Sequence, residues 1–74
     1  QRALVDICDE EFDNALTWVI DTQQPLEEET SEAVARVLDL TPARTDIRQR
    51  MQAGLKSLEQ AGRLRRRAGH LFLQ

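Results

Sequence analysis

Amide and cationic side chains gather in the second half of the chain, and they suit the recognition of a polyanion. Gln49 and Gln52 are three residues apart, so they lie on one side if the segment is helical. Each amide offers a donor and an acceptor, the pair that an adenine edge requires. Hydroxyls and cations around them can hold phosphate oxygens. The predicted DNA-binding residues are Arg44, Thr45, Arg48, Gln49, Gln52, Lys56, Arg63, Arg65 and Arg67.

No combination of nucleophile, base and orienting group indicates catalysis. No Ser/His/Asp or Cys/His arrangement has a supporting context, and no glycine-rich loop could cradle a phosphate. His70 is the single histidine, and we interpret it as a structural or backbone-contacting residue. Cys8 is the single cysteine, which excludes an internal disulfide and a Cys/His zinc site. We interpret Cys8 as a small apolar residue. The sequence therefore predicts a non-enzymatic domain without metal or cofactor.

Charge is distributed unevenly between the two halves of the chain. Residues 1–41 hold two arginines and eleven acidic residues, a balance of −9, whereas residues 42–74 hold eight basic and two acidic residues, a balance of +6. The net charge of −3 therefore conceals a basic segment, and this segment favours a local contact with nucleic acid. The alternative is that the two halves neutralise each other within the fold.

Length and hydropathy are those of one small globular domain. We expect residues 11–74 of the 74-residue chain to form the domain, and residues 1–10 to be a lead-in from a longer parent chain. Hydrophobic residues make up 41% of the chain, enough for a compact core. No apolar run approaches the roughly 20 residues of a membrane span. With a single cysteine, a reducing, cytoplasmic setting is expected.

The first helix is predicted after the carboxylates of residues 9–11, which favour a helix N-terminus. Its apolar face recurs at helical intervals and comprises Phe12, Ala15, Leu16, Val19 and Ile20. Trp18 lies off this face, and we interpret it either as the rim of the core or as a contact to a partner. Gln24 precedes Pro25 and is expected to be extended, which ends the helix.

A short strand and a second helix are predicted next. Residues 25–27 are expected to form a minimal edge strand with Leu26 pointing inward, followed by a solvated acidic surface at residues 27–29. Thr30 or Ser31 is expected to cap the helix. The predicted apolar face of this helix comprises Ala33, Val34, Val37, Leu38 and, closing it, Leu40.

A third helix is predicted over residues 46–61, after the break at Pro42 and with Thr45 as its cap. Its apolar side comprises Ile47, Met51, Gly54, Leu55 and Leu58. Gly54 within that side costs roughly 1 kcal/mol relative to alanine. We therefore expect it to permit the close approach of a neighbouring helix. Gly62 is expected to end the helix in a left-handed conformation.

In the last segment the hydrophobic period changes to two around a predicted turn at Ala68 and Gly69. This turn pairs Arg67 with His70, Arg66 with Leu71, Arg65 with Phe72, and Leu64 with Leu73. The inner face would then hold Leu64, Leu71 and Leu73. The outer face would hold Arg63, Arg65, Arg67, His70 and Phe72. Because a slip of one residue exchanges the faces, the DNA-binding residues of the hairpin depend on this turn.

The predicted order of helix, short strand, helix, helix, strand, strand is typical of an α+β winged helix-turn-helix, with three helices and a small antiparallel β-hairpin wing. The third helix would lie in the major groove of double-stranded DNA, and the wing would meet the backbone or the adjacent minor groove. Two alternatives stay open. The domain could be a protein-interaction or dimerisation module whose acidic and basic halves pair head to tail, or it could pack against an enzyme core of the parent chain.

Several motifs carry a family resemblance: Gln24-Pro25-Leu26, VARVL at 34–38, RTDIR at 44–48, GRLRR at 62–66 and HLFL at 70–73. The chain resembles the small domain of unknown function at the C-terminal end of large bacterial proteins, in which superfamily I helicase and restriction-endonuclease-like nuclease segments are joined. It departs from that family's pattern at Gln24, where glycine is frequent, and at Leu73, where tryptophan is frequent. The resemblance implies a non-catalytic accessory domain that helps a helicase–nuclease engage DNA. A ligand-binding domain before Gln1 would instead indicate a transcription regulator.

Overall fold

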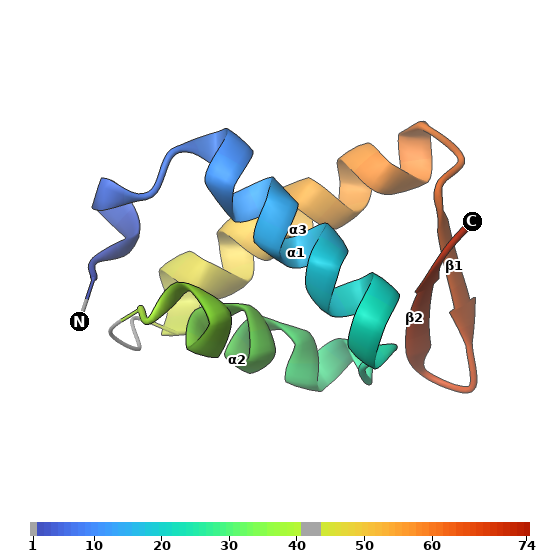
Figure 1. The fold of residues 1–74 in the computed structure, drawn as a ribbon. Helices are drawn as coiled ribbons and strands as arrows, with labels where there is room; N and C mark the ends of the chain where they lie inside the picture. The colour runs from blue at the N-terminus through green and yellow to red at the C-terminus, as the bar shows by residue number, and fades with distance from the viewer. Residues whose placement is uncertain (1, 41–43) are drawn as a thin grey trace.

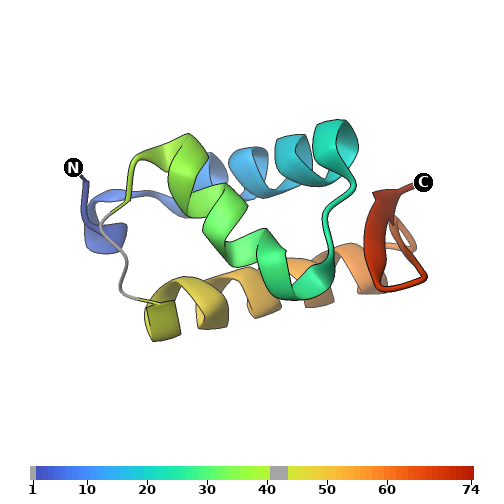
Figure 2. The same cartoon turned by 90° about the horizontal axis from the view of Figure 1, so that it is seen from below.

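Over residues 2–40 and 44–74, which the computed structural model describes, the chain forms three α-helices followed by a β-hairpin. A 3₁₀ turn, η1 (Leu4–Asp6), precedes α1 (Asp9–Gln23), α2 (Glu27–Leu38) and α3 (Arg44–Gln60). The hairpin consists of β1 (Leu64–Arg67) and β2 (His70–Leu73), and it closes the end of the molecule opposite the N-terminus (Figure 1, Figure 2). The predicted α+β winged helix-turn-helix layout is confirmed.

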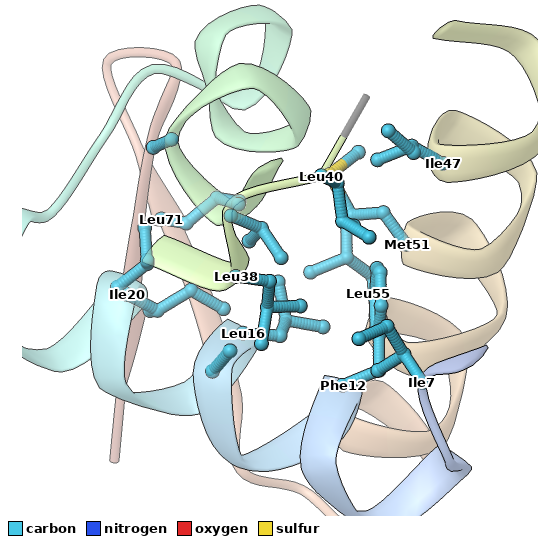
Figure 3. Packing of buried hydrophobic residues seen from close by; sticks show 14 of the residues in the cluster. Ile7, Phe12, Leu16, Ile20, Leu38, Leu40, Ile47, Met51, Leu55 and Leu71 are labelled. Carbon is cyan, nitrogen blue, oxygen red and sulfur yellow. The ribbon is translucent and has the colours of Figure 1, made fainter. Parts of the chain in front are cut away.

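The core lies between the three helices and β2 (Figure 3). The predicted apolar faces of α1 and α3 are buried throughout, and Leu71 brings β2 into the same cluster. Ile7 is buried too, and Leu4 packs against the cluster, so the lead-in contributes to the core. The backbone N–H of Arg2 donates to the carbonyl of Asp39 at 2.8 Å, which fastens the lead-in beside the end of α2.

The start of α2 differs from the prediction. The helix begins at Glu27, so neither Thr30 nor Ser31 is its cap, and the acidic residues 27–29 form its first turn instead of a separate surface. Carboxylates there are favoured by the helix dipole. Thr30 is fully buried, and its Oγ1 donates to the carbonyl of Leu26 at 2.9 Å. The buried face therefore turns toward Thr30, Val34 and Leu38, which leaves Val37 44% exposed, contrary to the prediction.

The strand predicted over residues 25–27 is reduced to one bridged residue at the junction between α1 and α2, because Glu27 already belongs to α2. Leu26 forms an antiparallel bridge with His70, and the carbonyl of Pro25 accepts from the backbone N–H of Leu71 at 2.9 Å. The prediction for Gln24 was wrong, because this residue is left-handed with φ 47° and ψ 57°. The residue before a proline is kept out of the right-handed helical region. The left-handed conformation satisfies that restriction, and the N–H of Gln24 still donates to the carbonyl of Ile20.

Gly54 and Gly62 have the two roles that the sequence predicts. A Cβ at Gly54 would lie 2.7 Å from Cδ2 of Leu16, so the glycine permits the close approach of α1. Gly62 is left-handed with φ 69°. Its N–H donates to the carbonyl of Glu59, and the N–H of Arg63 donates to that of Leu58, which together end α3 in a Schellman motif.

The hairpin has the predicted register. Leu64 pairs with Leu73, Arg65 with Phe72, Arg66 with Leu71, and Arg67 with His70. Ala68 and Gly69 form the turn with φ of 52° and 81°, positive at both positions as in a type I′ turn. On the inner face Leu71 is fully buried, and Leu64 and Leu73 pack against the core. The cationic side chains of the outer face consequently point away from the core.

Candidate nucleic-acid interface

One side of α3 is exposed, and it carries the residues predicted to contact bases. Thr45, Gln49, Gln52 and Lys56 are all exposed, because they recur at helical spacing opposite the buried side that contains Met51. This polar strip lies along the helix without an interruption by a large apolar side chain. Such a strip is the arrangement that a recognition helix presents to a groove.

The start of α2 makes part of this region acidic. Arg48 and Gln52 line a hollow between α2, α3 and the hairpin turn, together with Glu27, Glu28, Ser31, Met51 and Gly69. A helix N-terminus usually favours a phosphate. The carboxylates in the first turn of α2 oppose a phosphate there, so an anionic ligand is directed toward α3 and the hairpin. Arg44 begins α3, but its side chain is outside the described part of the chain, and so is its predicted contact.

The arginines divide into two groups by their ion pairs. Arg2, Arg50 and Arg66 contact carboxylates at distances of 2.6 to 3.1 Å. Within residues 2–40 and 45–74, the basic side chains without an ion pair are Arg36, Arg48, Lys56, Arg63, Arg65 and Arg67. Five of these six lie on α3 or the hairpin segment. All five belong to the predicted DNA-binding set, and each is exposed.

Arg66 holds the hairpin against two helices. Its Nε lies 2.7 Å from Oε1 of Glu27 on α2, and its Nη2 lies 2.6 Å from Oε1 of Glu59 on α3. The hydrogen bond with Glu27, and then that with Glu59, raises the pKa of the Arg66 guanidinium above its usual value. The prediction that Glu27 is simply solvated is therefore wrong. Arg65 and Arg67 are adjacent to Arg66 in β1, but they lie on the outer face of the hairpin, whereas Arg66 lies on the inner face.

Arg50 joins α3 to α1. Its Nε lies 3.1 Å from Oδ1 of Asp9, and its Nη2 lies 2.9 Å from Oδ1 of Asp13. The guanidinium carbon is 4.8 Å from the ring centroid of Phe12, a cation–π contact. Only 21% of the Arg50 side chain is exposed. This arginine therefore stabilises helix packing and is not offered to a ligand.

The outer face of the hairpin contains both cations and an aromatic ring. Arg65, Arg67 and Phe72 border one hollow, whereas Arg63 borders another, between α1 and α3. The predicted wing arginines are thus split, with Arg63 on a different flank of the molecule. His70 Nδ1 lies 2.6 Å from the carbonyl oxygen of Gln24. Since a carbonyl only accepts, Nδ1 carries the proton and donates, and the backbone-contacting interpretation of His70 is confirmed.

Cys8 has a local structural role that the sequence did not reveal. It is exposed, and the interpretation that it is a small apolar residue and not a nucleophile stays a prediction. Cys8 is the N-cap of α1, and its Sγ accepts from the backbone N–H of Glu11 at 3.5 Å. Among the described residues, no group of three or more His, Cys, Asp or Glu side chains is placed to hold a metal ion. No helix of the described ranges is long and apolar enough to cross a membrane.

Comparison of the chain with models of known protein families, with curated proteins and with solved structures finds no match. The resemblance to the helicase-associated domain therefore stays a prediction.

The pairing of Arg66 is the main site feature that sequence reasoning missed. A signal was present, because the predicted register already placed Arg66 opposite Leu71, on the face that packs against the core. A guanidinium on the face that packs against the core loses part of its hydration, and carboxylate partners compensate for that loss. The sequence did not show which carboxylates would come within reach, since Glu27 is 39 residues away along the chain.

Proposed function

We propose that this domain binds double-stranded DNA, with α3 in the major groove and the hairpin against the backbone, as an accessory domain of a larger protein. The observation that carries the proposal is the separation of the arginines into two groups. Arg50 and Arg66 are held by carboxylates, whereas Arg48, Lys56, Arg65 and Arg67 are exposed without an ion pair on α3 and the hairpin.

The carboxylates of α3 lie toward its two ends. Asp46 is in the first turn of the helix, and Glu59 is paired with Arg66 at 2.6 Å. Between them, the exposed strip has amides and cations. Gln49 and Gln52 would contact base edges through their amides. Lys56 and the arginines would contact phosphates and set the register of the protein on the duplex.

The test is a fluorescence anisotropy titration of a labelled duplex at several salt concentrations. Four phosphate contacts, from Arg48, Lys56, Arg65 and Arg67, predict a slope of about −3.6 for the logarithm of the association constant against the logarithm of salt concentration. Replacement of one of them by glutamine should make the slope shallower by about 0.9. R36Q is the matched control, because Arg36 is an exposed, unpaired arginine on α2.

Two results would contradict DNA binding by this face. Absence of duplex binding at low salt would remove the proposal altogether. Equal losses of affinity in K56Q and in R36Q would show that the affinity depends on the total charge of the domain and not on the exposed residues of α3. The context implied by the resemblance, a helicase joined to a nuclease, belongs to the same proposal and is tested by the coding sequence on either side of this segment.

A second candidate is head-to-tail self-association, favoured by apolar exposure on the acidic side. Trp18 is 53% and Val37 is 44% exposed, and the first turns of α1 and α2 hold the carboxylates of residues 9–11 and 27–29. The basic face of a second copy is complementary to this surface in charge. Sedimentation velocity should then show concentration-dependent oligomers that W18S and high salt dissociate. A monomer at every concentration would exclude this candidate.

A further inference from the structure

Phe72 is an aromatic residue of the hairpin that does not join the core. Its neighbours Leu71 and Leu73 face inward and contact the buried cluster, whereas Phe72 alternates to the outer face and is only partly buried. The ring is also not covered by a guanidinium. In the described part of the chain, the cation–π contact joins Arg50 of α3 to Phe12 of α1 and does not involve Phe72.

The surroundings of Phe72 are cationic. Arg65 is its cross-strand partner, and Arg67 is the next residue of β1 on the same face. Residues directly opposite on one face have their Cβ atoms about 5 Å apart, and diagonal neighbours about 7 Å, so both guanidinium groups can reach the periphery of the ring. Arg65, Arg67 and Phe72 border one hollow. Neither arginine has an ion pair, and no carboxylate belongs to the hairpin.

This combination matches the chemistry of an unpaired nucleotide. A partly exposed aromatic ring can stack on a nucleobase of any sequence, and adjacent cations contact the phosphates on either side of it. A base inside a duplex is already stacked on both faces, so it cannot reach Phe72. A base in a single-stranded overhang is free to do so.

We infer that the outer face of the hairpin binds unpaired nucleotides of a single-stranded overhang, with the base stacked on Phe72 and the phosphates held by Arg65 and Arg67. This inference rests on the proposed function, because the overhang is presented by a duplex that lies against α3. The preferred substrate is consequently a junction between duplex and single strand and not an uninterrupted duplex. An acidic peptide would satisfy the arginines but would leave the ring without a planar partner.

The experiment compares three labelled probes by fluorescence anisotropy: a blunt duplex, the same duplex with a five-thymidine overhang, and the five-thymidine strand alone. Base–aromatic stacking of about 1 to 3 kcal/mol per base predicts at least a fivefold tighter binding of the overhang probe than of the blunt probe. F72L should abolish this preference without changing affinity for the blunt duplex. W18L is the matched control, since Trp18 is an exposed aromatic residue on α1 and its replacement should leave the preference intact.

A spectroscopic readout reports the stacking directly. In the double variant W18F/F72W the single tryptophan stands on the hairpin, and the overhang probe should quench its fluorescence more strongly than the blunt probe does. Circular dichroism of F72L and of the double variant verifies the fold, which is expected to persist because Phe72 does not contribute to the core.

The outcomes separate this inference from the proposed function. Equal affinity for the overhang and blunt probes would overturn the inference and leave duplex binding standing. Binding of the single strand that depends on Phe72, without binding of the blunt duplex, would support the hairpin site and overturn the α3 proposal. Absence of binding to all three probes at low salt would overturn both.

Discussion

Replacement of Gly54 by alanine tests how closely α1 and α3 approach each other. The added Cβ would lie 2.7 Å from Cδ2 of Leu16 and 3.4 Å from Oδ1 of Asp13. Leu16 is fully buried, so its methyl group can move only by displacing other core atoms. The 3.4 Å distance to Asp13 is an ordinary van der Waals contact, so Asp13 need not move. Resistance to the substitution therefore comes from Leu16.

Two opposing terms determine the free energy of unfolding of G54A. Alanine in a helix interior is favoured over glycine by about 1 kcal/mol. Overpacking of a filled core costs about 1 to 3 kcal/mol. Since the predicted Cβ contact at 2.7 Å is shorter than a van der Waals contact, we expect overpacking to exceed the gain in propensity. The expected net loss is about 1 kcal/mol, which lowers Tm by about 4 to 8 °C in a domain of this size.

The assay is urea unfolding followed by circular dichroism, with m compared between variants to verify two-state behaviour. A53G is the control for helix propensity, because Ala53 is the exposed neighbouring residue. This variant should lower the free energy of unfolding by about 1 kcal/mol without any change in core packing. L16V shortens the opposing side chain, so G54A should be less harmful in its presence, as measured in a double-mutant cycle. If G54A is more stable than the parent protein, the close approach of the two helices is refuted.

Three further predictions concern the hairpin and the lead-in. Asparagine tolerates the left-handed conformation of Ala68, φ 52°, better than alanine does, so A68N should stabilise the domain by about 0.5 to 1 kcal/mol in urea unfolding; a lower midpoint would refute the type I′ turn. R66Q removes both ion pairs of a side chain that is 42% exposed, so the free energy of unfolding should fall by at most about 1 kcal/mol per pair, and by less at 1 M salt. R65Q should leave the free energy of unfolding unchanged. The hydrogen bond from Arg2 lowers the pKa of Glu11 below its ordinary value of 4.5. The stability that this carboxylate contributes is therefore present above pH 4.5 and is lost as the pH falls through the lowered pKa. E11Q should flatten the dependence of the unfolding midpoint on pH in that range, and an unchanged dependence would contradict this prediction.

Periodicity in the sequence predicted most of the fold because it reports on local geometry. The apolar spacing of α1 and α3 identified their buried sides, and Gly62 marked the end of α3. The turn at Ala68 and Gly69 then determined every pair of the hairpin, since in a two-residue loop the turn fixes the register. These features depend on residues that are close along the chain, which is why a single sequence contains enough information for them.

Other predictions failed where a distant segment altered a local preference. The backbone of Leu26 is bridged to His70, so α2 begins directly after it and Thr30 becomes a core residue. Rotation of the buried face toward Thr30 exposed Val37. Gln24, which is left-handed, lies in the same connection between α1 and α2 as Leu26. None of these outcomes follows from propensity, because each depends on where the hairpin packs.

The sequence by itself determined that cations concentrate in residues 42–74, and that amides and cations share the outer side of α3. Only the tertiary structure decided which cations are available. Arg50 and Arg66 meet carboxylates from α1, α2 and α3, whereas Arg65 and Arg67 face outward beside Phe72. The physical reason is that an ion pair requires two groups to come within about 4 Å. The partners are up to 41 residues apart along the chain, so only folding brings them together.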